Sequence, residues 1–383
     1  MRQAYIFENH TRILYEALDT RMQPTEEYRA LPAKVAQWVL KQICAAWKSY
    51  FAAIAEYRRH PGKFLGHPKL PKYLNKQGRN LLVFTYQAIS QAKKNEGWIL
   101  PSGLDLRVAT DIPQDRIAQV RLVPKPTHYV VEVVYEQLED PQLLDASRIA
   151  AVDIGVNNLA VLTSNHPGFV PLVVNGHPLK SLNHWYHKRR AQLQATLSKG
   201  QFTSRALEEL ADYRQRAISS YLHTASRTLI NTLVGADIQT LVIGKNVGWK
   251  QEVNMGKKNN QTFVFLPHAR FIEMLIYKAA LVGIRVILIE ESYTSKCSFL
   301  DGETIGKHDE YAGKRIKRGL FRAGNGHTIN ADVNGSYNIL CKAFPHAFSL
   351  EALAAVRRHP SVLPLPDRRQ ARHTQSRTLL ATG

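Results

Sequence analysis

The longest stretch of periodic apolar residues near the start of the chain lies between residues 31 and 60. Apolar side chains recur there at intervals of three and four positions, which is the period of an amphipathic helix. They are Val35, Trp38, Val39, Ile43, Trp47, Phe51 and Ile54. The pattern predicts a helix about seven turns long, and we expect this helix to be the main element of a small helical module.

The pattern changes in residues 60–80, where Pro and Gly interrupt any helix. Basic residues alternate there with Phe64 and Tyr73. Positive charges interleaved with aromatic rings suit a surface that contacts the backbone of a nucleic acid and stacks on its bases. A solvated linker is the alternative interpretation. The candidate nucleic-acid contacts in this segment are Lys63, Lys69, Lys72 and Lys76.

Between residues 81 and 136, short apolar runs separated by Pro and Gly predict the strands of a small β-barrel or sandwich. A polar linker follows. Beyond it, three strand-like runs precede two long helical patterns. A strand at 238–244, a helix at 268–283 and a strand at 284–291 are expected after them. This order is typical of an α/β architecture, with helices packed on a mixed sheet.

One charged residue interrupts the first of these later strands. Residues 149–162 read "IAAVDIGVNNLAVL", two apolar runs joined by a tight Gly-Val-Asn-Asn connection, with Asp153 at the end of the first run. A carboxylate at the core end of an apolar strand costs several kcal/mol unless a cation or a metal ion pairs with it. Asp153 is therefore a candidate metal ligand.

Further carboxylates stand where other core elements begin or end. Asp332 precedes a short helical pattern, and Glu290 and Glu291 end the strand at 284–291. Taken singly, such residues are more often helix caps or solvated side chains. Together with Asp153 on one sheet they form an oxygen ligand set of the type that Mg²⁺ prefers, with two ions bridging the attacking and leaving oxygens of a phosphodiester. The set predicts a metal-dependent nuclease.

The overall charge also favours a nucleic-acid partner. The chain has 51 Lys and Arg residues against 31 Asp and Glu, a formal net charge of +20. A polyanionic partner is the first expectation, with a basic ribosomal or membrane-surface protein as the alternative. We expect no membrane partner, because no apolar run is long enough to span a bilayer and the amino terminus lacks a signal-peptide core. Three widely separated cysteines imply no disulfide framework.

The segments "VDIGVNNLAV", "YTSKCSF" and "NADVNGSYNIL", with a long helical hairpin after the first, resemble the RuvC-type, ribonuclease H-like nuclease of the TnpB proteins. These proteins are transposon-encoded, RNA-guided DNA endonucleases, related to the single-effector type V CRISPR nucleases. The resemblance covers most of the chain and matches Asp153 to the first catalytic Asp and Asp332 to the last. It implies a guide RNA, a double-stranded DNA target with a short flanking motif, and a cytoplasmic, nucleoid-associated prokaryotic protein.

The same resemblance implies a domain order. A helical recognition module and a wedge-like β-barrel module precede a RuvC-like α/β nuclease domain, which carries a degenerate zinc-ribbon-like insert. The basic, Pro-broken tail is expected to be disordered. The expected boundaries are residues 1–10 and 81–147 for the β-barrel module, 11–80 for the helical module, 148–343 for the nuclease domain, 295–328 for its insert and 344–383 for the tail.

The chain departs from the family at the strand that usually ends in a catalytic Glu, because Gly244 and Lys245 stand at that point. It is either a nuclease whose Glu has moved, or a nuclease-inactive RNA-guided DNA-binding protein that acts as a repressor or transposition accessory factor. Adjacent strands lie about 4.8 Å apart, and glycine leaves space, so a Glu one strand over can reach the metal. We favour the relocated site, with Glu291 preferred to Glu290. The expected catalytic metal ligands are Asp153, Glu291 and Asp332.

A DNA-strand transposase is a third class of function, because a ribonuclease H-like sheet supports metal-dependent phosphoryl chemistry in general. Fold alone does not separate it from a guided nuclease. Strand transfer without any RNA requirement would favour the transposase.

The insert departs from the family in its zinc ligands. Relatives carry two Cys-x-x-Cys pairs that hold a structural zinc ion, whereas here Cys297 stands alone, with His308 and His327 as the only other suitable ligands. We therefore expect no zinc, and an insert held by packing. Its basic residues are expected to contact phosphates, with a solvated loop as the alternative. They are Lys314, Arg315, Lys317, Arg318 and Arg322.

Overall fold

The computed structural model describes residue 8 and residues 13–74, 78–90, 97–245 and 266–365. The chain divides into two compact units, Met1–Gln137 and Leu138–Gly383. Each unit has its own hydrophobic core. None of the helices in the described ranges is long and apolar enough to cross a membrane.

The first unit is built on the helix that the apolar period predicted. This helix, α4, spans Ala33–Arg59 and follows the shorter helices α2 (Tyr15–Met22) and α3 (Glu26–Arg29). Val35 of α4 packs against the strands of the unit, and Leu40 packs against the residues of α2 and α3. The prediction of a long amphipathic helix is confirmed.

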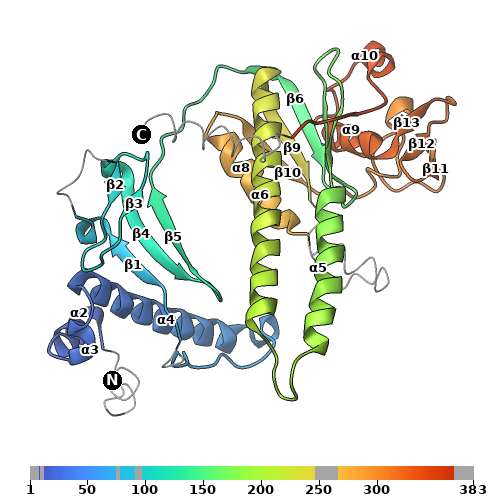
Figure 1. The fold of residues 1–383 in the computed structure, drawn as a ribbon. Coiled ribbons are helices and arrows are strands. Elements are labelled where there is room, and N and C mark those ends of the chain that lie inside the picture. The colour runs from blue at the N-terminus through green and yellow to red at the C-terminus, as the bar shows by residue number, and fades with distance from the viewer. Residues whose placement is uncertain (1–7, 9–12, 75–77, 91–96, 246–265, 366–383) are drawn as a thin grey trace, which may run out of the picture. The chain divides into compact units, whose positions relative to one another are not determined.

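The strands of the first unit pair in two antiparallel sheets (Figure 1). β1 (Leu82–Thr85), β4 (Ile117–Pro124) and β5 (Tyr129–Tyr135) form a three-stranded sheet in the order β1-β4-β5. β2 (Trp98–Ile99) pairs with β3 (Val108–Ala109). Short strands were predicted between residues 81 and 136, and the structure confirms them.

The second unit contains a six-stranded mixed sheet in the order β10-β9-β6-β7-β8-β14 (Figure 1). β6, β7 and β8 form an antiparallel meander, and β9 and β10 add in parallel beside β6. This is the ribonuclease H-like arrangement that the sequence predicted. The strands are β6 (Asp145–Asp153), β7 (Asn158–Ser164), β8 (Leu172–Asn175), β9 (Ile238–Gly244), β10 (Arg285–Ile289) and β14 (Ser361–Val362).

Helices cover both faces of this sheet (Figure 1). They are α5 (His177–Ala195), α6 (Arg205–Gly235), α8 (His268–Ala280) and α9 (Ala331–Ala343). Alternate residues of β6 point to opposite faces: Ala150 and Val152 lie in the core shared with α6 and α8, whereas Ile149 and Ala151 pack with α9. Asp153 continues the second series, so its side chain lies on the α9 face.

The insert that precedes α9 has a small sheet of its own. β11 (Lys314–Lys317), β12 (Leu320–Arg322) and β13 (Thr328–Asn330) pair antiparallel in that order. Phe321 of β12 and Ile329 of β13 are buried against α9. The insert is therefore attached to the same helix that carries Asp332.

Part of the tail that was predicted to be disordered is folded. After α10 (Leu350–Ala355), β14 pairs in parallel with β8, and Leu363 is buried in the core of the second unit. The prediction was wrong here because a two-residue strand has no periodicity to detect. Its bonds are backbone bonds, from Ser361 N to Pro171 O and from Leu363 N to Val173 O, both 2.8 Å long. Residues 366–383 of the tail lie outside the described residues.

Candidate active site

Asp153 ends β6 and lies against the backbone of α9. A β-carbon on Gly335 of α9 would lie 2.8 Å from Asp153 Oδ2, which is too close, so a glycine is needed beside this carboxylate. Burial, and then the charges of Glu291 and Asp332, raise the pKa of Asp153 to about 8, whereas Arg315 lowers it. Additional positive charge at this position would stabilise the ionised form of Asp153.

Asp332 lies in the first turn of α9, where Asn330 caps the helix. The Asn330 side chain accepts hydrogen bonds from the backbone N–H groups of Asp332 and Val333, at 3.0 and 3.1 Å, which fixes this turn. Asn158 Nδ2 donates to Asp332 Oδ2 at 2.7 Å, and Arg315 Nη2 lies 3.3 Å from Asp332 Oδ1. Sequence reasoning missed Asn158, whose only signal is a polar residue at the first position of an apolar strand.

Glu291 follows β10, at the same end of the sheet as Asp153. β9, which ends at Gly244, lies between β6 and β10. A β-carbon on Gly244 would lie 2.7 Å from Glu291 Oε2, so the Glu291 side chain fills the space that this glycine leaves. Burial raises the pKa of Glu291, while Lys342 lowers it. Glu290 is exposed, so Glu291 is the glutamate of this pair that lies toward Asp153.

Three carboxylates, Asp153, Glu291 and Asp332, therefore gather at one end of the sheet. Within the described residues, no three His, Cys, Asp or Glu side chains stand close enough together to hold a metal ion. The two oxygens of Asp332 contact Asn158 and Arg315 instead. The three carboxylates still suit a hard divalent cation such as Mg²⁺. The negative charges of Glu291 and Asp332 raise the pKa of Asp153, and a bound divalent cation would offset that repulsion.

A pocket of about 480 Å³ opens over Asp153 and Asp332, between the β6–β7 turn and the insert, and Glu291 does not line it. Asp153 and Asp332 line it together with Asn158, Arg315 and Arg318. Carboxylates beside two guanidinium groups suit a phosphodiester, because the carboxylates can bind metal ions while the arginines contact phosphate oxygens. The residue types that line the pocket therefore match those that a phosphodiester ligand needs.

Two asparagines one turn apart on α9 tie the segment after Glu291 to the helix. Asn338 Nδ2 donates to the carbonyl oxygens of Thr294 and Cys297, both at 2.8 Å, and Asn334 Nδ2 donates to the Cys297 carbonyl at 2.8 Å. Both asparagines are buried. Buried amides with satisfied hydrogen bonds fix local geometry, so the chain that leaves Glu291 is held next to the helix that carries Asp332.

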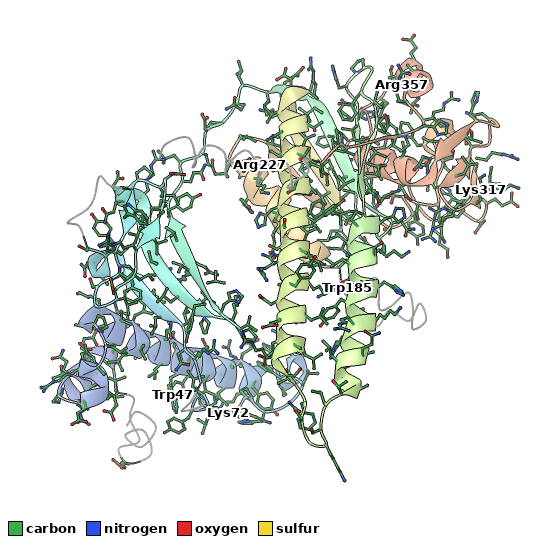
Figure 2. The ribbon with its side chains drawn as sticks, in the orientation of Figure 1. Trp47, Lys72, Trp185, Arg227, Lys317 and Arg357 are labelled. Atoms are coloured by element: carbon green, nitrogen blue, oxygen red, sulfur yellow. The ribbon has the colours of Figure 1, made fainter. Side chains whose placement is uncertain are left out.

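The other predicted nucleic-acid contacts fall into two groups. In the insert, Lys314, Arg315, Lys317, Arg318 and Arg322 are all exposed, and Lys317 projects from its outer side (Figure 2). Only Arg315 and Arg318 among them line the pocket. In the first unit, Lys69 and Lys72 are exposed, whereas Lys63 pairs with Glu56 at 2.8 Å. Lys76 lies outside the described residues. The nucleic-acid roles of all these residues stay predictions.

Comparisons with known proteins find relatives of this chain. A family model described as a probable transposase, OrfB_IS605, matches residues 129–250, and a model of the Cas12f1-like TNB domain matches residues 268–339. The TnpB-like protein ORF457 of Acidianus two-tailed virus is 27% identical over 209 residues, which are 51% of this chain and 42% of that relative. The chain thus spans less than half the length of the curated relative it matches.

Solved structures are similar at lower identity. A Cas12f1–sgRNA–target DNA complex is 16% identical, with a TM-score of 0.46 over 59% of this chain and 46% of that one. A CRISPR-Cas12f ternary complex is 12% identical, with a TM-score of 0.38 over 88% of this chain and 77% of that one.

Proposed function

The chain is a member of the TnpB family, and from that premise we propose that it is a transposon-encoded, RNA-guided DNA endonuclease with a relocated catalytic glutamate. It hydrolyses phosphodiester bonds at the carboxylates Asp153, Glu291 and Asp332, with two Mg²⁺ ions as cofactors. The proposal is supported by one observation above all. The side chain of Glu291 fills the space over Gly244, at the end of the sheet where Asp153 lies.

Each residue at this end of the sheet has a proposed role. Asp153, Glu291 and Asp332 would hold the Mg²⁺ ions, whose chemistry is to polarise the scissile phosphate and to activate a water molecule. Asn158 orients Asp332 through its 2.7 Å hydrogen bond. Arg315 and Arg318 contact phosphate oxygens of the DNA strand in the pocket. Arg315, which pairs with Asp332 in this structure, would leave that carboxylate and pair with a phosphate when DNA binds.

The proposed partners are a guide RNA and a double-stranded DNA target with a short flanking motif. The net charge of +20 supports a polyanionic partner. In guided nucleases base pairing supplies most of the sequence specificity, while the protein binds backbones and the flanking motif. We assign the flanking-motif contacts to the first unit, whose exposed lysines stand beside exposed aromatic rings such as Tyr73.

A nuclease-inactive, RNA-guided DNA-binding protein is the second candidate. Two observations favour it. Position 244 is a glycine and not an acid, and among the described residues no three ligands are already arranged around a metal position. The two candidates share the guide RNA and differ only in cleavage. A DNA-strand transposase differs from both, because it needs no guide.

The experiment that separates these functions starts from protein purified from its native operon context. RNA that copurifies is sequenced and mapped, and the complex is incubated with matched and mismatched duplex DNA in Mg²⁺. We expect RNA from the transposon end and Mg²⁺-dependent cleavage of the matched duplex only. Guided binding without cleavage under any divalent ion would favour the inactive binder, and RNA-independent strand transfer would favour the transposase.

A further inference from the structure

The insert at residues 295–328 corresponds to a zinc ribbon in the family, but its side chains do not fit a zinc ion. Cys297 is its only cysteine. The Cys297 side chain is fully buried, and its sulfur contacts the carbonyl oxygens of Thr304 and Gly306, each at 3.6 Å. Burial raises the pKa of this thiol, whereas a zinc ligand is a thiolate.

The two histidines of the insert do not complete a zinc site either. His308 Nε2 is hydrogen-bonded to Thr304 O at 2.7 Å, and the His327 side chain is exposed. A tetrahedral site needs four converging N or S ligands. The insert must therefore be held together in another way.

Glu303 joins two separate turns of the insert. Its Oε2 accepts a hydrogen bond from the backbone N–H of Ser298 at 2.6 Å, and its Oε1 accepts one from the N–H of Ala312 at 2.9 Å. Ser298 is fully buried. Hydrogen bonds from backbone amides to a carboxylate are stronger than those between neutral groups, so one side chain fastens residue 298 to residue 312.

Asp301 makes the matching connection on the other side. Its Oδ2 accepts from Gly324 N at 2.6 Å and its Oδ1 from Asn325 N at 3.1 Å. The turns that the two acids hold are in direct contact, because a β-carbon on Gly324 would lie 2.7 Å from Ala312 O. The two carboxylates thus bind four backbone amides from three segments, around residues 298, 312 and 324–325.

We propose that Asp301 and Glu303 replace the structural metal ion of the ribbon in this chain. In a zinc ribbon, one ion joins two turns that are distant in sequence. Here turns that are distant in sequence are joined by two carboxylates that come from one short segment of the chain. The fastened turns at residues 312 and 324–325 flank β11 and β12, so the two acids also fix both ends of the hairpin that carries Arg315 and Arg318.

Hydrogen exchange of the full chain tests the proposal in the absence of nucleic acid and of Mg²⁺, so its result does not depend on the proposed nuclease activity. Glu303→Gln and Asp301→Asn keep the shape of each side chain but replace one acceptor oxygen by an NH₂ group. In Glu303→Gln we expect hydrogen exchange to rise by about tenfold or more in the peptides that contain Ser298 and Ala312. In Asp301→Asn we expect the same rise in the peptides that contain Gly324 and Asn325.

Glu310→Gln is the matched control, because Glu310 is an exposed acid of the same insert and the substitution changes the net charge equally. It should leave the exchange rates unchanged. Wild-type protein dialysed against a zinc chelator should also keep its slow exchange, and its zinc content should be far below one ion per chain. Unchanged exchange in both acid variants, or an insert that opens when one bound zinc is removed, would overturn the proposal.

Discussion

Glu291 Oε2 lies 2.7 Å from the position that a β-carbon would occupy on Gly244. The carboxylate of one strand end therefore uses the space left by the glycine of the neighbouring strand. The same carboxylate acts on Asp153, since its charge is the largest contribution after burial to the raised pKa of that residue. The glycine that ends one strand and the glutamate that follows the next are thus parts of one arrangement.

The first prediction concerns this glycine. Gly244→Ala should force the Glu291 side chain, or Ile339 Cδ1 at 2.7 Å, to move away from the new methyl group. We expect guided cleavage to fall by about tenfold or more and the stability to fall by about 1 to 3 kcal/mol, as for overpacked cores. Single-turnover cleavage and urea unfolding measure the two effects.

Gly235→Ala is the control for this substitution. Gly235 ends α6, and a β-carbon there would meet nothing within 4 Å, so cleavage should be unchanged and stability equal or slightly higher. Wild-type cleavage by the Gly244→Ala protein would show that Glu291 does not depend on that space.

The second prediction concerns nucleic-acid binding by the first unit. Lys69 and Lys72 are exposed in a Pro-rich segment, and replacing both by Ala should reduce the slope of log affinity against log salt concentration by about 1 to 2. Lys63→Ala should change the slope less, because Lys63 already pairs with Glu56 at 2.8 Å. The measurement is RNA and DNA binding at several salt concentrations. If the double variant keeps the wild-type slope, the segment is a linker.

The third prediction is a pH dependence of stability from Lys278. This side chain is buried on α8 and donates to His223 O at 2.8 Å and to Ser226 Oγ at 2.6 Å. Burial, and then the charge of Arg227, lower its pKa from 10.5 to about 8. Between these values the folded protein binds fewer protons than the unfolded chain, so folding stability rises with pH.

We expect wild-type protein to gain about 2 kcal/mol of stability relative to Lys278→Met between pH 7.5 and 9.5, measured by urea unfolding. Lys307→Met, at an exposed position, should follow the wild type at every pH. A constant difference between wild type and Lys278→Met across this range would contradict the assigned pKa.

Much of the second unit was predictable because its strands are continuous apolar runs. β6 and β7 were visible on either side of "DIGVNN", and Asp153 stood out because it is a charge in such a run. Gly244 and Glu291 were predictable as neighbours because parallel strands end at the same edge of a sheet. The apolar pattern of each strand involves only neighbouring residues, so it can be read directly from the sequence.

Other features depend on contacts between distant segments. Asn158 bonds to Asp332 across 174 positions of sequence, and nothing in the strand that begins at Asn158 indicates that partner. The acids Asp301 and Glu303 resemble solvated loop residues until the fold brings their backbone donors together. On α4, Ile43 fits the apolar period but is 39% exposed, because periodicity identifies a helix and not the partner that covers each side of it.

The central claim, that the third catalytic carboxylate belongs to Glu291, is tested most directly by guided DNA cleavage and guided DNA binding of Glu291→Gln. Glutamine keeps the size of the side chain and removes the charge that would hold Mg²⁺. We expect Glu291→Gln to abolish cleavage as fully as Asp153→Ala and to bind its guided target as the wild type does, while Glu290→Gln, at the exposed neighbouring position, cuts normally. Wild-type cleavage by Glu291→Gln would contradict the relocated active site.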